Sequence, residues 1–295
     1  MTDLIALLGH PVAHSISPLM QQAALDALAV DARYEAWDVP PAELPRAVER
    51  LRERGVFGAN VTVPHKVELL RRADRVDALA ERVGAVNTIV CRDGRLHGSN
   101  TDVAGVLRAL ADAEVEVAGL EVVLIGAGGA ARAVVAAMRE ARAVLVTIAN
   151  RTPGRAEPLI AVGGEDLAVR SCPLDPASEA LRSALRRARL VIHSTPLGMR
   201  HGPDEQATPL PAELFEAGQA AFDLVYTPER TPFLRAAEAA GARPIGGLGM
   251  LVHQGAESFR LWTGLEPPVE VMFAAARAAL AHPNDAASSE GERRP

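Results

Sequence analysis

Short apolar runs alternate along most of the chain with segments in which apolar residues recur every three or four positions. A short apolar run closed by glycine, proline or a polar residue is typical of a buried strand, and the longer period is typical of a helix. The predicted strands are 4–9, 34–39, 58–63, 84–90, 122–125, 143–149, 190–194 and 222–226, with a hairpin over 91–98. The predicted helices are 18–28, 43–54, 66–73, 103–113, 131–142, 155–162, 232–240, 250–262 and 268–281, and 246–249 predicts a glycine-rich turn. This alternation predicts an α/β fold with a doubly wound parallel sheet.

Composition and charge narrow the class of protein. The 295 residues correspond to roughly two domains, and 48% hydrophobic with 23% charged residues is typical of a globular chain. A net charge of −6 without a block of basic residues argues against a nucleic-acid or anionic-membrane partner. No apolar run reaches the about 18 residues of a membrane span, and no basic-then-apolar leader opens the chain, so we expect a cytoplasmic protein. Cys91 and Cys172 stand apart and the histidines are scattered, so we expect neither a disulfide nor a metal.

Lys66 is the only lysine in a chain with 31 basic residues. A genomic preference for arginine codons accounts for the arginines but not for the one residue that departs from it. Lysine can titrate and arginine cannot, which points to chemistry that needs a primary amine at this position. The alternative is an exposed residue at the start of a helix, a role that arginine fills equally well.

A glycine loop follows the clearest predicted strand. Gly126-x-Gly128-x-x-Ala131 comes directly after residues 122–125 and opens a helix, which is the context that a dinucleotide-binding loop needs. Glycines allow the backbone to approach a pyrophosphate, and the helix N-terminus stabilises its charge. The candidate binding residues are Gly126, Ala127, Gly128, Gly129 and Ala130. The alternative is a purely structural glycine turn.

The residues after the next strand indicate which dinucleotide binds. An NAD site places an Asp or Glu about twenty residues after the glycine loop, to bind the ribose 2′-hydroxyl. This chain has Asn150-Arg151-Thr152 there, with Arg155 close behind. Two guanidinium groups without a carboxylate suit the 2′-phosphate of NADP(H), although Arg155 by itself could be a solvated surface charge.

Several motifs in order resemble those of the shikimate dehydrogenase family over nearly the whole chain. They are the segments 9–18 (GHPVAHSISP), 58–66 (GANVTVPHK), 84–88 (GAVNT), 100–102 (NTD), the glycine loop, 150–152 (NRT) and 247–254 (GLGMLVHQ). The resemblance implies an NADP-dependent oxidoreductase that reversibly reduces 3-dehydroshikimate to shikimate, in the biosynthesis of chorismate and the aromatic amino acids. It also implies a Rossmann-type cofactor domain beside an α/β substrate domain. The expected limits are 1–102 for the substrate domain, 103–242 for the NADP-binding domain, 243–282 for C-terminal helices that return to the substrate domain, and 283–295 for a disordered tail.

The resemblance implies that Lys66 and Asp102 are the catalytic pair. Reduction of a ketone needs a proton donor at the developing alkoxide, and a lysine tuned by burial and a nearby carboxylate can supply it. Asp102 would orient that amine and contact the substrate. Asp102 could also be the N-cap of the following helix.

Further binding residues are implied by the same resemblance. Ser15 and Ser17 would bind the substrate carboxylate, which agrees with two hydroxyls at a predicted helix start, although Ser17 before Pro18 could simply be the N-cap. Thr62, Asn87, Tyr226 and Gln254 would bind the substrate ring, and Leu224 and Gly247 would lie beside the nicotinamide. Asn87 and Gln254 could instead satisfy buried backbone groups, and Tyr226 could be a core aromatic residue.

The sequence departs from the family pattern at Gln21-Gln22, where His-Asn is common, and at Phe222, where tyrosine is common. These departures leave open a quinate/shikimate or aminoshikimate-type dehydrogenase. A non-catalytic NADP-binding sensor is the alternative from another class, and it would not need Lys66 with Asp102. The expected partner is the small-molecule substrate alone, with the protein a monomer or homodimer.

Overall fold

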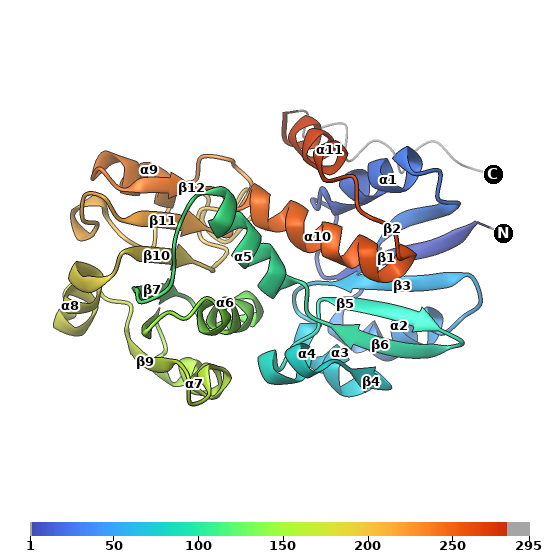
Figure 1. Ribbon diagram of the computed structural model, residues 1–295, viewed down its shortest axis with the longest axis horizontal. Helices are drawn as coiled ribbons and strands as arrows, with labels where there is room; N and C mark the ends of the chain where they lie inside the picture. Colours follow the sequence, from blue (N-terminus) through green and yellow to red (C-terminus); the bar gives the residue numbers. More distant parts are fainter. Residues whose placement is uncertain (1, 282–295) are drawn as a thin grey trace. The chain divides into compact units, whose positions relative to one another are not determined.

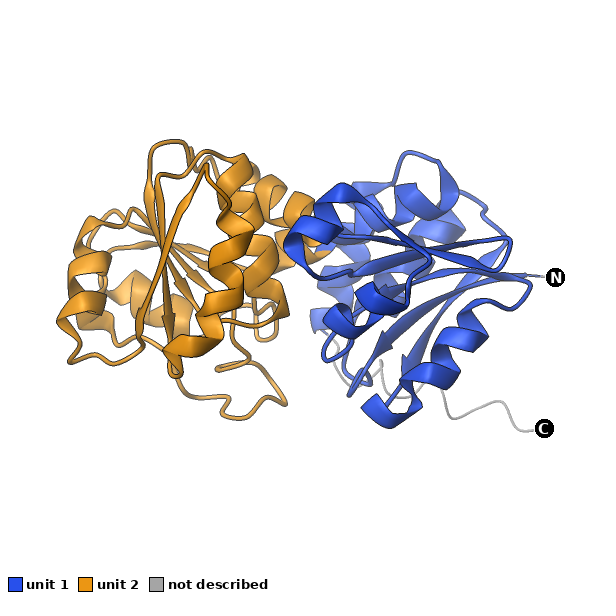
Figure 2. Cartoon of the chain, turned by 90° about the horizontal axis from the view of Figure 1, so that it is seen from below, with its two compact units in different colours: residues 1–101, 252–295 blue, residues 102–251 orange. Residues whose placement is uncertain are grey.

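The computed structural model describes residues 2–281, so the predicted tail lies outside the described residues. The chain divides into two compact units, shown in blue and orange in Figure 2. Unit 1 is Met1–Thr101 with Val252–Pro295, and unit 2 is Asp102–Leu251. Unit 2 therefore extends past the expected limit of 242. In the described part of the chain, no helix is long and apolar enough to cross a membrane.

Unit 1 is built on a mixed six-stranded sheet with the order β2-β1-β3-β5-β6-β4 (Figure 1). Its strands are β1 (Asp3–Gly9), β2 (Ala32–Asp38), β3 (Val56–Val61), β4 (Arg75–Val76), β5 (Thr88–Arg92) and β6 (Arg95–Ser99). β1 runs parallel to β2 and β3, whereas β5 runs antiparallel to β3 and β6. Its helices are α1 (Ser17–Ala27), η1 (Pro41–Glu43), α2 (Leu44–Leu51), α3 (Lys66–Arg72), α4 (Ala78–Val83), α11 (Val269–Ala281) and, from Val252 on, α10 (Leu248–Thr263). The C-terminal chain thus returns to the N-terminal sheet, where α11 packs against α1.

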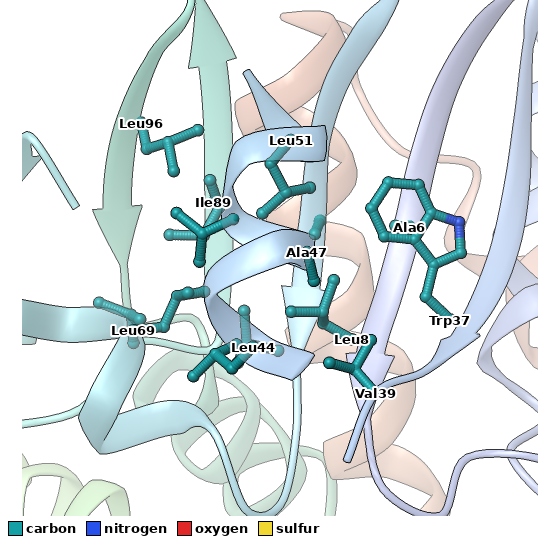
Figure 3. Close-up of a cluster of buried hydrophobic side chains, with 14 of the residues drawn as sticks. Ala6, Leu8, Trp37, Val39, Leu44, Ala47, Leu51, Leu69, Ile89 and Leu96 are labelled. Carbon is teal, nitrogen blue, oxygen red and sulfur yellow. The ribbon is translucent and has the colours of Figure 1, made fainter. Parts of the chain in front are cut away.

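One core of unit 1 lies between its sheet and α2, as Figure 3 shows. Leu44, Ala47 and Leu51 recur with helical spacing on the buried face of α2. They face Leu8 and Ile89 on the strands, and both of these side chains are fully buried. Burial of each such aliphatic side chain contributes roughly 1.5–3 kcal/mol, so this face fixes α2 on the sheet.

Unit 2 is an all-parallel sheet with the order β12-β11-β10-β7-β8-β9. Its strands are β7 (Glu121–Ile125), β8 (Leu145–Asn150), β9 (Ala168–Pro173), β10 (Leu190–His193), β11 (Ala220–Asp223) and β12 (Arg243–Ile245). Its helices are α5 (Asp102–Asp112), α6 (Gly129–Glu140), η2 (Pro153–Ala156), α7 (Glu157–Gly163), α8 (Glu179–Arg187), η3 (Ala212–Leu214) and α9 (Pro232–Ala239). The strand order reverses between β7 and β10, and ligands of doubly wound sheets bind at the carboxyl ends of the strands at such a switch point.

The expected α/β fold with a doubly wound sheet is confirmed, and the mixed sheet of unit 1 contains the expected hairpin, formed by β5 and β6. Three details differ. The elements β4, α4, β9, α8 and β12 were not predicted. The strand expected to begin at residue 84 begins at Thr88, because Gly84 is the left-handed C-cap of α4. The expected turn over 246–249 is cut short because α10 already begins at Leu248.

Candidate functional site

The glycine loop leads from β7 into α6, as expected. Gly126 has φ +107°, and a Cβ there would lie 2.7 Å from Ser194 Oγ, so this position requires glycine. Gly128 differs, because its φ is −93° and a Cβ would meet nothing within 4 Å. The space beside Gly128 is therefore not filled by any described residue. It lies at the N-terminus of α6, which no side chain caps. That geometry fits a pyrophosphate approaching the backbone closely.

The segment 150–155, here called the arginine loop, follows β8. It lies beside the glycine loop because β8 is the parallel neighbour of β7. Asn150 ends β8, and its Nδ2 donates a hydrogen bond of 2.7 Å to the Thr152 carbonyl oxygen, which orders the loop. Arg151, Thr152 and Arg155 are all exposed. The loop thus offers two guanidinium groups at the same edge of the sheet as the free space at Gly128, which fits a dinucleotide with a 2′-phosphate.

A buried polar network lies at the end of β10. The sequence motifs did not indicate it. His193 and Asp223 are both fully buried, and their Nδ1 and Oδ1 atoms are 2.9 Å apart. His193 Nε2 lies 2.5 Å from the Thr195 hydroxyl, while Asp223 accepts hydrogen bonds from the Thr231 hydroxyl (2.6 Å) and the Val225 N–H (3.0 Å). The one signal in the sequence was an ionisable side chain at the end of the apolar run Leu190-Val191-Ile192.

Leu224 and Gly247 lie together in unit 2, although they are far apart in the sequence. Leu224 follows β11 and is half-buried, and Gly247 follows β12. A Cβ at Gly247 would lie 2.5 Å from the Leu224 carbonyl oxygen, so only glycine allows this close approach. Tyr226 comes two residues after Leu224 and is also half-buried, so it is not a fully enclosed core aromatic residue.

Asn87 lies at the centre of a buried polar cluster in unit 1. Its Nδ2 donates to the Thr101 hydroxyl (2.8 Å) and to Gln254 Oε1 (3.2 Å). Its Oδ1 accepts from the Thr101 N–H at 2.7 Å, so Asn87 does satisfy a buried backbone group. The Ser258 hydroxyl joins the cluster through Thr101 (3.0 Å). The structure therefore brings Asn87 and Gln254 together, and it adds Thr101 and Ser258, which were not among the predicted residues.

Asn60 and Tyr34 support this cluster from the sheet. Asn60 Nδ2 donates to the Ser258 hydroxyl at 2.9 Å, and the Tyr34 hydroxyl donates to Asn60 Oδ1 at 2.8 Å. Burial raises the pKa of the Tyr34 hydroxyl above its ordinary value, so it remains a proton donor. Buried polar groups that are fully paired in this way hold a single arrangement.

Ser15 and Ser17 lie at the start of α1, as expected, but Ser17 is not its N-cap. Ser17 is the first helical residue, Ile16 is the N-cap, and no side chain caps the helix. The interpretation of Ser17 as the N-cap is therefore wrong, because the chain turns into helical geometry one residue earlier. Ser15 Oγ accepts a hydrogen bond of 3.3 Å from the Ser17 N–H, which places the two residues at one helix terminus.

Lys66 and Asp102 each begin a helix. Lys66 is the first residue of α3, is half-buried, and follows Thr62 and the cis peptide bond between Val63 and Pro64. Asp102 is the first residue of α5 and is 3% exposed. Thr62 is half-buried after the end of β3. The half-burial of Lys66 is inconsistent with a freely exposed surface residue.

A hollow of about 480 Å³ opens elsewhere in unit 2, beside α8. It is lined by Glu121, Leu145, Thr147, Arg170, Ser171, Cys172, Ala180, Ser183 and Arg187. Glu121 and Leu145 are the first residues of β7 and β8, so the hollow lies toward the amino ends of the strands, opposite the glycine loop. Among residues 2–281, no group of His, Cys, Asp and Glu side chains is arranged to hold a metal ion.

A doubly wound parallel sheet with a glycine loop at its switch point, in one chain with a second α/β unit, defines the class of two-domain dinucleotide-dependent oxidoreductases. Three family models match segments of this chain. Residues 7–89 match the shikimate dehydrogenase substrate binding domain, 109–197 match shikimate / quinate 5-dehydrogenase, and 247–277 match the shikimate 5′-dehydrogenase C-terminal domain.

Individual relatives agree with the family models. A shikimate dehydrogenase (NADP(+)) of Moorella thermoacetica is 47% identical over 280 residues, covering 95% of this chain and 94% of the relative. The crystal structure of shikimate 5-dehydrogenase from Thermus thermophilus in complex with NADP(H) and shikimate has a TM-score of 0.83 at 46% identity, covering 94% of this chain and all of that one. The Listeria monocytogenes enzyme in complex with shikimate and NAD has a TM-score of 0.84 at 34% identity, covering 92% and 95%. The chain belongs to the shikimate dehydrogenase family, and the resemblance drawn from its motifs is confirmed.

Proposed function

We propose that this enzyme catalyses the reversible, NADPH-dependent reduction of 3-dehydroshikimate to shikimate, in the pathway to chorismate and the aromatic amino acids. The observation that carries the proposal is the match of 94% of the chain to a structure that holds both NADP(H) and shikimate. We place the substrate on unit 1 and the dinucleotide on unit 2. We also propose a cytoplasmic location, no nucleic-acid partner, and a monomer or homodimer.

For the cofactor, the residues of unit 2 fit a phosphorylated dinucleotide. Gly126, Ala127, Gly128, Gly129 and Ala130 would hold the pyrophosphate, and Asn150, Arg151, Thr152 and Arg155 would hold the adenosine 2′-phosphate. Leu224 and Gly247 would lie beside the nicotinamide. When bound, NADPH supplies the hydride.

For the substrate, Ser15 and Ser17 would bind the carboxylate at the start of α1. The other ring contacts would come from Thr62, Asn87, Asp102, Tyr226 and Gln254. Asn87 and Gln254 support this role because one side-chain hydrogen bond fixes them together, so both would present a single arrangement to a ring hydroxyl.

Proton transfer is assigned to Lys66 with Asp102. The Lys66 ammonium group would protonate the developing C3 alkoxide during reduction, and its neutral amine would accept the proton in the reverse direction. The Asp102 carboxylate would orient the amine and stabilise its charge. The hydrogen bond from the Thr101 N–H to Asn87 supports this assignment, because it fixes the backbone immediately before Asp102.

The test is NADPH oxidation, followed by absorbance with 3-dehydroshikimate, for the wild type and Lys66→Ala, with NADPH binding measured in both. We expect turnover to fall at least about 100-fold with NADPH affinity unchanged, because general acid catalysis contributes about 10²–10⁴-fold. Lys66→Arg should be equally impaired, since a guanidinium does not titrate. Arg71→Ala, an exposed position on the same helix, is the matched control and should keep wild-type turnover. Wild-type NADPH binding without turnover on 3-dehydroshikimate would reject the substrate, and quinate with either cofactor would be tried next.

A further inference from the structure

We propose that His193 is a positioning residue of the NADP(H) site, acting through the hydroxyl of Thr195. This inference rests on the proposed function, because it assumes that the dinucleotide binds to unit 2. It adds a residue that none of the motifs in the sequence indicated.

Thr195 lies where a dinucleotide is expected to cross the sheet. It is the second residue after β10, and β10 and β7 are the neighbouring strands at the switch point. Its Cγ2 lies 2.8 Å from where a Cβ on Gly126 would stand, so it packs directly against the first glycine of the loop. Thr195 is half-exposed, whereas His193 is fully buried. The threonine can therefore contact a ligand and the histidine cannot.

The two nitrogens of the His193 ring have different partners. Asp223 already receives hydrogen bonds from a hydroxyl and a backbone N–H, which stabilise its negative charge, so the carboxylate accepts from Nδ1. In the tautomer that carries its proton on Nδ1, Nε2 is an acceptor, and the Thr195 hydroxyl donates a hydrogen bond to it. Thr195 Oγ1 also accepts a hydrogen bond of 3.3 Å from the Leu197 N–H, so one of its two lone pairs remains for the site. That lone pair suits a donor of the dinucleotide, such as a ribose hydroxyl or an amide N–H.

The network is anchored at both ends. Thr231, which donates to Asp223, is also the N-cap of α9 and accepts the Leu234 N–H at 3.2 Å. At the other end the Ser194 hydroxyl donates to the Ile125 carbonyl oxygen at 2.8 Å, tying the segment after β10 to the last residue of β7. A buried histidine is costly in an apolar strand unless both nitrogens are paired, and here both are. The hydrogen bonds of the His193 ring thus orient the Thr195 hydroxyl, which we propose contacts the dinucleotide.

The test is a double-mutant cycle with His193→Asn and Thr195→Val, read by the Kd for NADPH and by separate KM values for NADPH and 3-dehydroshikimate. Asparagine retains a donor toward Asp223 but does not reach Thr195, and valine keeps the shape of threonine without the hydroxyl. We expect each variant to raise the Kd for NADPH roughly three- to tenfold, the range of one net hydrogen bond, with the KM for 3-dehydroshikimate unchanged. The double variant should be no weaker than the weaker single variant, because both changes remove the same interaction.

Two further variants separate positioning from a merely structural role. Thr195→Ser keeps the hydroxyl and should restore wild-type affinity. Thr147→Val removes a buried hydroxyl from the same sheet, where Arg170 donates to it at 3.2 Å, and should lower stability without changing the Kd for NADPH. Wild-type affinity in both His193→Asn and Thr195→Val, or effects that multiply in the double variant, would overturn the inference. Failure of the wild type itself to bind NADPH would instead reject the proposed function.

Discussion

Arg151 is the residue that we propose distinguishes NADPH from NADH. It follows Asn150 at the carboxyl end of β8, next to the glycine loop, and its guanidinium is exposed. No carboxylate occupies the segment 150–155 where an NAD site would need one. The side chain would therefore gain a partner from NADPH that NADH lacks.

Arg151→Ala should weaken NADPH binding about tenfold and leave NADH binding unchanged, because a partly solvated charge-assisted hydrogen bond is worth about 1.4 kcal/mol. Titration of each cofactor by fluorescence gives the two dissociation constants. Arg186→Ala, an exposed arginine on α8, controls for the general loss of positive charge in unit 2. Equal weakening of both cofactors would show that Arg151 does not contact the 2′-phosphate.

Some of the site residues could be predicted from the sequence, and others could not. Lys66 was conspicuous because it is the only lysine, and the glycine loop because its spacing follows from backbone geometry. His193 was not, since nothing in the sequence shows that Asp223, thirty residues away, lies against its ring. Thr101 was likewise noticed only as part of a motif, because its hydrogen bond to Asn87 depends on how β5 and β6 pair. Long-range polar pairs are consequences of the fold, so local patterns do not reveal them.

Among the secondary-structure elements, the strands that are buried on both faces of a sheet were predicted correctly. β1, β7 and β10 are buried along nearly their whole length and therefore appear as continuous apolar runs. β9 was missed because it is an edge strand, with Arg170 and Ser171 exposed and only Cys172 buried. α8 was missed because arginines surround its narrow buried stripe of Leu181, Ala184 and Leu185. An exposed edge strand and a helix with a narrow buried stripe both lack the hydrophobic signal on which the prediction depends.

The packing of α10 on the sheet of unit 1 depends on one glycine. Trp262 Nε1 donates to the Ile89 carbonyl oxygen at 2.9 Å, and Gly58 on β3 lies directly beside this bond. A Cβ on Gly58 would stand 2.0 Å from that oxygen and 2.8 Å from the indole nitrogen. The backbone oxygen cannot move away without disturbing the pairing of β3 with β5.

Gly58→Ala should therefore lower the free energy of unfolding by about 2 kcal/mol or more, in the upper range for overpacking. Urea denaturation followed by circular dichroism measures the change. Gly249→Ala is the matched control, because that glycine is helical and its Cβ would meet only Ala109, with the Cβ atoms 3.6 Å apart. The control should be neutral or stabilising by up to about 1 kcal/mol, as for alanine in place of glycine in a helix. Equal stability of the two variants would contradict this account of Gly58.

At the scale of the whole molecule, the chain separates the two proposed ligands between its units. The residues proposed for the dinucleotide all belong to unit 2, and most of those proposed for the substrate belong to unit 1. Asp102 is the first residue of unit 2 and follows Thr101, the last residue of the N-terminal part of unit 1. Of the two residues proposed for proton transfer, Lys66 therefore belongs to unit 1 and Asp102 to unit 2.

Amide hydrogen exchange should show which unit binds which ligand. NADPH alone should slow exchange at the amides of 126–130 and 150–155, and shikimate alone at 15–17 and 62–66, because each ligand protects the backbone that it orders. Peptide-level mass spectrometry with each ligand separately gives the comparison, and the amides of β9 serve as an internal reference. Protection by shikimate confined to unit 2 would contradict the assignment of the substrate to unit 1.

The single lysine has a practical consequence for how this enzyme can be observed. A lysine-specific protease can cut between residues 66 and 67 and nowhere else in the chain, and that bond lies in the first turn of α3. Proteases cleave such a bond only when the helix opens, so the rate of this one cut measures the local opening of α3. The residue proposed to move the proton thereby marks the stability of its own surroundings, without any label or substitution.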